Sequence, residues 1–236
     1  SLVQIFQLLA RNVMYRLDEV QGAGVVLLHG HGRTARSMRI LSRRLQSEGY
    51  MTYAPRYSSF RHSLPEIVTR LQPGISDFQA ALSGPRHFVT HSLGGLIARG
   101  LINASRPKSL GRVVMLAPPN GGSEWADLAI RLRLGRVVLG RVATMLQTRR
   151  AAMDEAQLGS VDFDLGIIAG DVAFDPLFPR LIMPKPNDGK VSVAATKIFG
   201  MLDHITLPAS HPFMMNNRIV TQQVLAFLRR GQFDKS

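Results

Sequence analysis

Ser92 is the residue in this chain best placed to do chemistry. Residues 88–95 read Phe-Val-Thr-His-Ser-Leu-Gly-Gly, so a short apolar segment leads into the serine and two glycines follow it. A strand, a sharp turn and a helix in this order push the hydroxyl out of a sheet and aim the next backbone N–H groups at the same point. The run matches the pattern G-x-S-x-G except at its first glycine, where Thr90 stands. Ser92 is therefore predicted to be a nucleophile for acyl transfer.

A serine nucleophile needs a base and a carboxylate that orients the base. Two histidines near the C-terminus are candidates, and His211, which follows the last predicted strand, is favoured over His204, which precedes it. Two acids are candidates for the carboxylate. Asp188 lies in a glycine-bearing turn and is favoured over Asp171, which ends a strand and could cap the following turn instead.

Two backbone N–H groups are needed to hold the negative charge that develops on the attacked oxygen. The loop His-Gly-His-Gly at 29–32 directly follows an apolar run, and its glycines allow a tight turn that presents an N–H group. The predicted donors are the N–H of His31 and the N–H of Leu93, the residue after the nucleophile. The side chain of His29 is expected to brace this loop.

The elements that must position these residues alternate along the chain. Apolar runs bounded by glycine or proline predict strands at 25–28, 51–54, 88–89, 113–116, 166–169 and 205–207. Helical periodicity predicts helices at 34–48, 64–82 with a break at Pro73 and Gly74, 93–104 and 220–230. This alternation predicts an α/β fold in which one doubly wound, mostly parallel sheet has helices on both faces. A single domain over 1–236 is expected.

Four segments together resemble the α/β-hydrolases of the serine lipase and esterase group. They are Val-Val-Leu-Leu-His-Gly-His-Gly at 25–32, Thr-His-Ser-Leu-Gly-Gly at 90–95, Leu-Ala-Pro-Pro-Asn-Gly-Gly-Ser at 116–123, and Asn-Asp-Gly-Lys-Val-Ser-Val at 187–193 with the later Ser-His-Pro-Phe at 210–213. The third is similar to a stretch found in bacterial lipases and in PGAP1-like lipid-remodelling deacylases. The order Ser92, Asp188, His211 is the order of that superfamily.

The resemblance implies an acyl-serine mechanism that uses no metal and no cofactor. The expected function is a serine carboxylester hydrolase acting on lipid-like or short acyl esters. An acyltransferase with the same triad is one alternative, and a catalytically silent protein that binds lipid or membrane is another. The departure at Thr90 puts a β-branched side chain into a strained turn, and it is expected to narrow the acyl site.

Residues 123–150 are interpreted as a lid-like insertion. Apolar residues recur there at helical spacing, and the glycines at 135 and 140 predict two short helices rather than one long helix. Such a segment either covers the acyl pocket with its apolar face or packs that face into the core as a surface helix. The apolar residues are Leu128, Leu132, Leu139, Val142 and Leu146, and the interleaved arginines are Arg131, Arg133, Arg136, Arg141, Arg149 and Arg150.

The charge balance narrows the class of partner. The 29 Lys and Arg residues against 16 Asp and Glu give a net charge of +13, which favours anionic partners. Nucleic acid is not expected, because the chain has no recognisable reading helix and only 7% aromatic residues. An anionic membrane surface, met by the arginines of the insertion, is the alternative to charge that serves only solubility. The sequence leaves the oligomeric state open.

Composition also limits the chemistry and the cellular location that we expect for the protein. The chain has no cysteine, which excludes disulfides, thiolate catalysis and cysteine metal sites. It has no apolar run of about 18 residues, the length of a membrane-spanning helix. Residues 1–10 are apolar but lack the basic leading region and cleavage site of a signal peptide. A bacterial protein that is cytoplasmic or peripheral to a membrane is expected.

Overall fold

The centre of the molecule is a parallel sheet of six strands. The computed structural model describes residues 20–173 and 183–235, and residues 1–19 of the expected single domain lie outside the described residues. The sheet has the order β2-β1-β3-β4-β5-β6, with every pair of neighbours parallel. The strands are β1 (Gly24–Leu28), β2 (Met51–Tyr53), β3 (Arg86–His91), β4 (Leu110–Leu116), β5 (Leu165–Gly170) and β6 (Asp203–Leu207).

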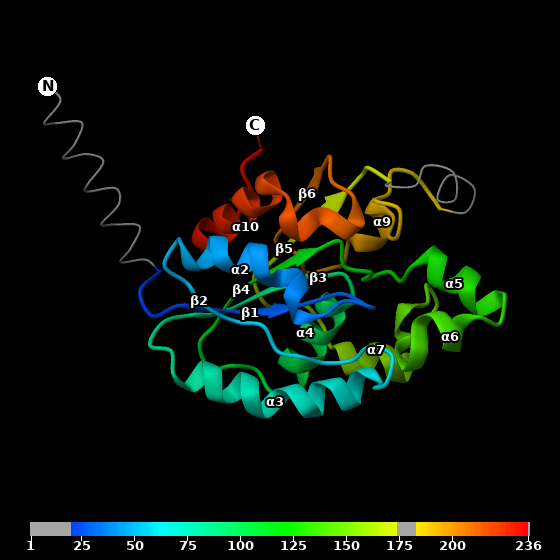
Figure 1. Cartoon of the computed structure of the whole chain (residues 1–236), viewed down its shortest axis with the longest axis horizontal. Coiled ribbons are helices and arrows are strands. Elements are labelled where there is room, and N and C mark those ends of the chain that lie inside the picture. Colours follow the sequence, from blue (N-terminus) through cyan, green and yellow to red (C-terminus); the bar gives the residue numbers. More distant parts are fainter. Residues whose placement is uncertain (1–19, 174–182, 236) are drawn as a thin grey trace, which may run out of the picture.

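Helices cover both faces of this sheet, as predicted. Helices α2 (Arg39–Gln46) and α10 (Arg218–Arg230) lie on one face, and α3 (Leu64–Ala80), α4 (Leu93–Ala104) and α7 (Ala152–Leu158) lie on the other (Figure 1). Side chains alternate along a strand. For this reason β1 contributes Val25 and Leu27 to the core beneath α2 and α10, and Val26 and Leu28 to the core beneath α3, α4 and α7. Both faces are apolar since both are covered, and this explains the uninterrupted apolar runs in the sequence.

Two predicted helices differ from those observed. The first is divided into a 3₁₀ turn, η1 (Ala35–Met38), and α2. The predicted break at Pro73 is wrong, because α3 runs through it from Leu64 to Ala80. Pro73 and Thr69, whose carbonyl would accept from an N–H at position 73, are both exposed residues. The buried face of the helix is continuous through Ile67, Leu71 and Ile75.

The insertion after β4 forms two short helices, as predicted. Helices α5 (Glu124–Arg131) and α6 (Gly135–Leu139) are followed by the 3₁₀ turns η2 (Gly140–Val142) and η3 (Thr144–Leu146). Val142 and Leu146 are buried, but Leu132, which was expected on the same apolar stripe, is 59% exposed. The two ends of the insertion meet, because the N–H of Ser123 donates to the carbonyl of Leu146 at 2.9 Å. Within the described residues, no helix is long and apolar enough to span a membrane.

Candidate active site

Ser92 occupies a strained turn at the carboxyl end of β3. Its backbone has φ 53° and ψ −123°, a conformation that favours glycine, and α4 begins at the next residue. The N–H of Ser92 donates to the carbonyl of Leu116 on the neighbouring strand β4 at 2.8 Å. A strained residue that its surroundings hold in place is a feature of functional sites. Ser92 as a whole residue is 9% exposed, and it lines a cavity at this edge of the sheet.

The loop after β1 passes directly beside the serine. A Cβ atom on Gly30 would lie 3.1 Å from Cβ of Ser92, so glycine allows the close approach. His29 stacks on the ring of Tyr57 with centroids 3.8 Å apart, and the Tyr57 hydroxyl donates to the His29 carbonyl at 2.5 Å, which braces the loop. His31 lines the cavity beside Ser92. The second predicted donor, the N–H of Leu93, belongs to the first turn of α4, where N–H groups have no partner within the helix.

Gly94 is the residue that lets α4 approach β1, and it supports a prediction about the turn. A Cβ atom there would lie 2.4 Å from the carbonyl oxygen of Leu28, a backbone atom that cannot rotate away. We expect Gly94→Ala to lower the free energy of unfolding in urea by ~1–3 kcal/mol, because the helix must shift. Gly100→Ala is the matched control on the same helix, since the tightest contact of its Cβ would be with the end of the Val68 side chain, at 3.1 Å, and its other contacts would be at ordinary van der Waals distance. Equal stability of the two variants would contradict this account.

Asp188 and His211 are in direct contact. Oδ2 of Asp188 accepts a hydrogen bond from Nδ1 of His211 at 2.6 Å, and the carboxylate is 1% exposed. Oδ1 accepts the N–H groups of Lys190 at 2.9 Å and Val191 at 2.8 Å. The N–H of His211 donates to the carbonyl of Asp188 at 3.1 Å. Both oxygens of the carboxylate are thus occupied, and its orientation toward the imidazole is fixed.

The three predicted residues Ser92, Asp188 and His211 line one cavity of about 470 Å³. The two alternatives do not line it. His204 lies within β6, where its Nε2 contacts Oγ1 of Thr196 at 3.0 Å, and Asp171 follows β5 at an exposed position. The remaining wall is mainly apolar and comes from the loop after β4, from the insertion and from the loops near Asp188 and His211. Its apolar members are Pro119, Trp125, Ala126, Leu139, Leu146, Val191 and Pro212.

His91 has a place in the site that the sequence did not predict. Its Nε2 donates to the carbonyl of His211 at 3.0 Å, and the two rings lie 4.7 Å apart. Burial is the main cause that holds the pKa of His91 well below its usual value, so the ring is neutral. His91 thus supports the backbone of His211. The sequence offers no base in His91, because it is too close to Ser92, and no local pattern marks its contact with His211, 120 residues away.

Lys190 and Trp125 form a second unpredicted feature of the wall. Nζ of Lys190 lies 3.9 Å from the centroid of the Trp125 ring. Burial lowers the pKa of Lys190, and the nearby Asp188 carboxylate partly offsets this. Thr90, by contrast, is buried in the sheet between Leu28 and Met115. It is not among the residues that line the cavity, so its expected narrowing of the acyl site is not supported.

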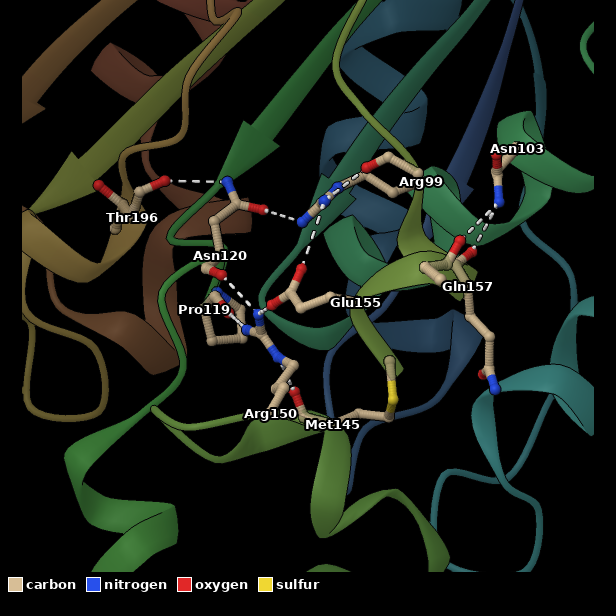
Figure 2. A network of polar contacts seen from close by, with 11 residues as sticks. Arg99, Asn103, Pro119, Asn120, Met145, Arg150, Glu155, Gln157 and Thr196 are labelled. Atoms are coloured by element: carbon tan, nitrogen blue, oxygen red, sulfur yellow. Dashed lines mark hydrogen bonds and ion pairs between the residues drawn. The ribbon is translucent and has the colours of Figure 1, made fainter. Parts of the chain in front are cut away.

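A buried arginine anchors the end of the insertion to the cavity wall. Arg150 donates to the carbonyl groups of Pro119 at 2.5 Å, Asn120 at 2.7 Å and Met145 at 2.7 Å, and it pairs with Glu155 of α7 (Figure 2). Pro119 lines the cavity. The guanidinium therefore joins the loop after β4, the end of the insertion and α7 in one rigid unit.

Asn120 connects the loop after β4 to two further helices, α4 and α9. Its side chain donates to the carbonyl of Thr196 in α9 (Val193–Thr196) at 2.9 Å and accepts from Arg99 of α4 at 3.4 Å (Figure 2). Burial lowers the pKa of Arg99 to about 10. Two buried arginines and one amide thus fix the loop that forms the base of the wall. Within the described residues, no cluster of three or more His, Asp or Glu is placed to hold a metal ion.

The arrangement of the sheet, the serine turn and the histidine loop agrees with the comparison to known families. Residues 25–219 match the model of the alpha/beta hydrolase family, and the chain belongs to that family. No protein with a curated description matches the chain in sequence.

Several solved structures share the fold. The mature lipase BlEst2 of Bacillus licheniformis has a TM-score of 0.73 at 14% identity, over 87% of this chain and 91% of that one. The phospholipase PlaB of Legionella pneumophila has a TM-score of 0.60 at 22% identity, over 74% of this chain and 45% of that one. A structure from work on carboxylesterases of the thaumarchaeon Nitrososphaera gargenis has a TM-score of 0.60 at 14% identity, over 87% and 89% of the two chains.

Proposed function

We propose that this chain is a serine hydrolase of carboxylic esters, with Ser92 as nucleophile, His211 as base and Asp188 as the group that orients the base. The observation that carries the proposal is the 2.6 Å contact between Asp188 Oδ2 and His211 Nδ1 in the cavity that also contains Ser92. Because Nδ1 donates to the carboxylate, Nε2 is left as the acceptor for a serine proton. The strained turn presents the serine hydroxyl to the same cavity.

The steps follow from these roles. His211 takes the proton of Ser92 as the serine oxygen attacks the ester carbonyl. The N–H groups of His31 and Leu93 stabilise the oxyanion. The tetrahedral intermediate expels the alcohol, which leaves with the proton from His211, and water then cleaves the acyl-serine by the same route.

The wall of the cavity favours an apolar acyl group. Trp125, Leu139 and Leu146 face it from the insertion, and they supply an apolar surface with few polar partners. A lipid-like or short-chain acyl ester fits such a wall, because transfer of the chain from water is favourable there. The lipase and phospholipase that share the fold support this class of substrate.

The test is covalent labelling of the purified chain with a fluorophosphonate, followed by mass spectrometry of the peptides. We expect one adduct, on Ser92, together with hydrolysis of p-nitrophenyl esters. A properly folded chain that gives no adduct would instead indicate a silent lipid-binding protein. Product analysis with an added alcohol acceptor separates hydrolysis from acyl transfer, since only a transferase gives mainly the new ester.

A further inference from the structure

The turn between α5 and α6 exposes apolar and cationic side chains together. In residues 131–137, here called the α5–α6 tip, Leu132 is 59% exposed, Leu134 is 48% exposed and Val137 is 78% exposed. Arg131, Arg133 and Arg136 alternate with them and are also exposed. Single exposed apolar residues are normal on a protein surface, whereas three within six positions indicate a contact site. Helices α5 and α6 lie beyond one end of the sheet (Figure 1).

The cations of this tip differ from two other arginines of the insertion in their ion pairing. Within the described part of the chain, no carboxylate lies at ion-pair distance from Arg131, Arg133 or Arg136. Two later arginines of the insertion differ, since Arg141 pairs with Glu66 and Arg150 with Glu155. With respect to the residues that the structure describes, the tip therefore presents three unpaired positive charges, on a chain whose net charge is already +13.

The backbone of the tip keeps an arginine where glycine would fit better. Arg133 has φ 59°, in the left-handed region. Its N–H donates to the carbonyl of Ile130, and the N–H of Leu134 donates to that of Ala129, each at 2.9 Å. These two bonds define a helix C-terminus of the Schellman type, whose left-handed position is usually glycine. The strain of a side chain at such a position is a pointer to function.

We propose that the α5–α6 tip docks onto an anionic lipid surface. Leu132, Leu134 and Val137 would enter the boundary between headgroups and acyl chains, and the three guanidinium groups would bind the phosphates, to which their planar donors are suited. An anionic bilayer offers an apolar interior to the apolar side chains of the tip and negative phosphates to its arginines. Trp125 at the start of α5 and Leu139 at the end of α6 line the cavity, so the two helices connect the docked tip to the cavity. The proposal goes beyond the proposed function and does not depend on it.

The test is co-sedimentation of the whole chain with vesicles of phosphatidylcholine, with or without phosphatidylglycerol. We expect binding only to the anionic vesicles, and we expect it to weaken as salt rises. Arg133→Gly removes one charge and relieves the strained turn. It should weaken binding about fivefold while leaving the melting temperature unchanged or higher. Val137→Ser should weaken binding several-fold without any change in charge.

Two control variants lie at the opposite, amino edge of the sheet. Lys108→Gln removes an exposed cation before β4, and Phe199→Ser removes a 98% exposed apolar side chain before β6. Both should bind vesicles as the unaltered chain does. Ser92→Ala should also bind normally, which separates a failure of docking from a failure of the proposed catalysis.

Four results would overturn the proposal. The first is equal binding to vesicles with and without phosphatidylglycerol, and the second is equal loss in the tip and control variants. The third is self-association in sedimentation velocity that Val137→Ser abolishes, in the absence of vesicle binding, which would identify a second copy as the partner. The fourth is binding to duplex DNA but not to vesicles, which would identify a nucleic acid.

Discussion

Ser92→Ala is expected to lower kcat for p-nitrophenyl esters by at least about a thousandfold. The substitution removes one oxygen and keeps Cβ, so the strained backbone at φ 53° is equally strained in both proteins. Urea unfolding should therefore give nearly the same stability, and the loss can be assigned to the missing nucleophile. Ser92→Gly should be equally inactive but more stable by ~1 kcal/mol, because glycine fits this conformation.

The matched control is Ser123→Ala. Ser123 is another buried serine of the same cavity, and its hydroxyl donates to the carbonyl of Lys190 at 2.9 Å. We expect its loss to change kcat by less than about tenfold, because a neutral hydrogen bond contributes ~1 kcal/mol. Activity that survives Ser92→Ala but not Ser123→Ala would remove Ser92 from the proposed role.

Asp188→Asn is expected to lower kcat by about 10,000-fold with little change in KM. The N–H groups of Lys190 and Val191 point at Oδ1, so the amide oxygen must take that position and the amide nitrogen must face His211. An NH₂ group there requires Nδ1 to be an acceptor. The proton of the ring then moves to Nε2, and the imidazole can no longer accept the proton of Ser92.

Asp171→Asn is the control for this experiment, because it is the other carboxylate that the sequence allows. Asp171 is exposed and does not line the cavity, so we expect its kcat to remain within about twofold, as for surface substitutions away from a site. A larger loss in Asp171→Asn than in Asp188→Asn would exchange the roles proposed for the two acids.

The sequence predicted the sheet well because the physics of a covered parallel sheet is local. The central strands β1, β4 and β5 carry buried apolar runs, and α4 begins and ends as predicted, at Leu93 and Ala104. The break at Pro73 was wrong because tertiary packing of one helix face outweighs the loss of one backbone hydrogen bond. The prediction that Leu132 belongs to the buried apolar stripe of the insertion was wrong. The helix ends there at a left-handed Arg133, and no glycine in the sequence signals that end.

In the site, the three proposed catalytic residues could be predicted from the sequence, but the contacts that support them could not. Residue type and chain order singled out Ser92, Asp188 and His211. The support that His91 gives to the backbone of His211 depends on two segments 120 residues apart, and no local pattern carries it. The contact of Lys190 with Trp125 is equally non-local.

The beginning and the end of the insertion are held to each other and to the wall of the cavity. Ser123 and Leu146 are hydrogen-bonded neighbours, and Arg150 fastens the outgoing chain to the base of the wall. The segment between these two points also contacts the Asp188 loop, because Ser123 donates to the carbonyl of Lys190 and Trp125 lies under its ammonium group, so a change in the segment would act on the cavity wall and on that loop together. The α5–α6 tip belongs to the same segment, so the proposed preference for an ester and the proposed attachment to a lipid surface would change together.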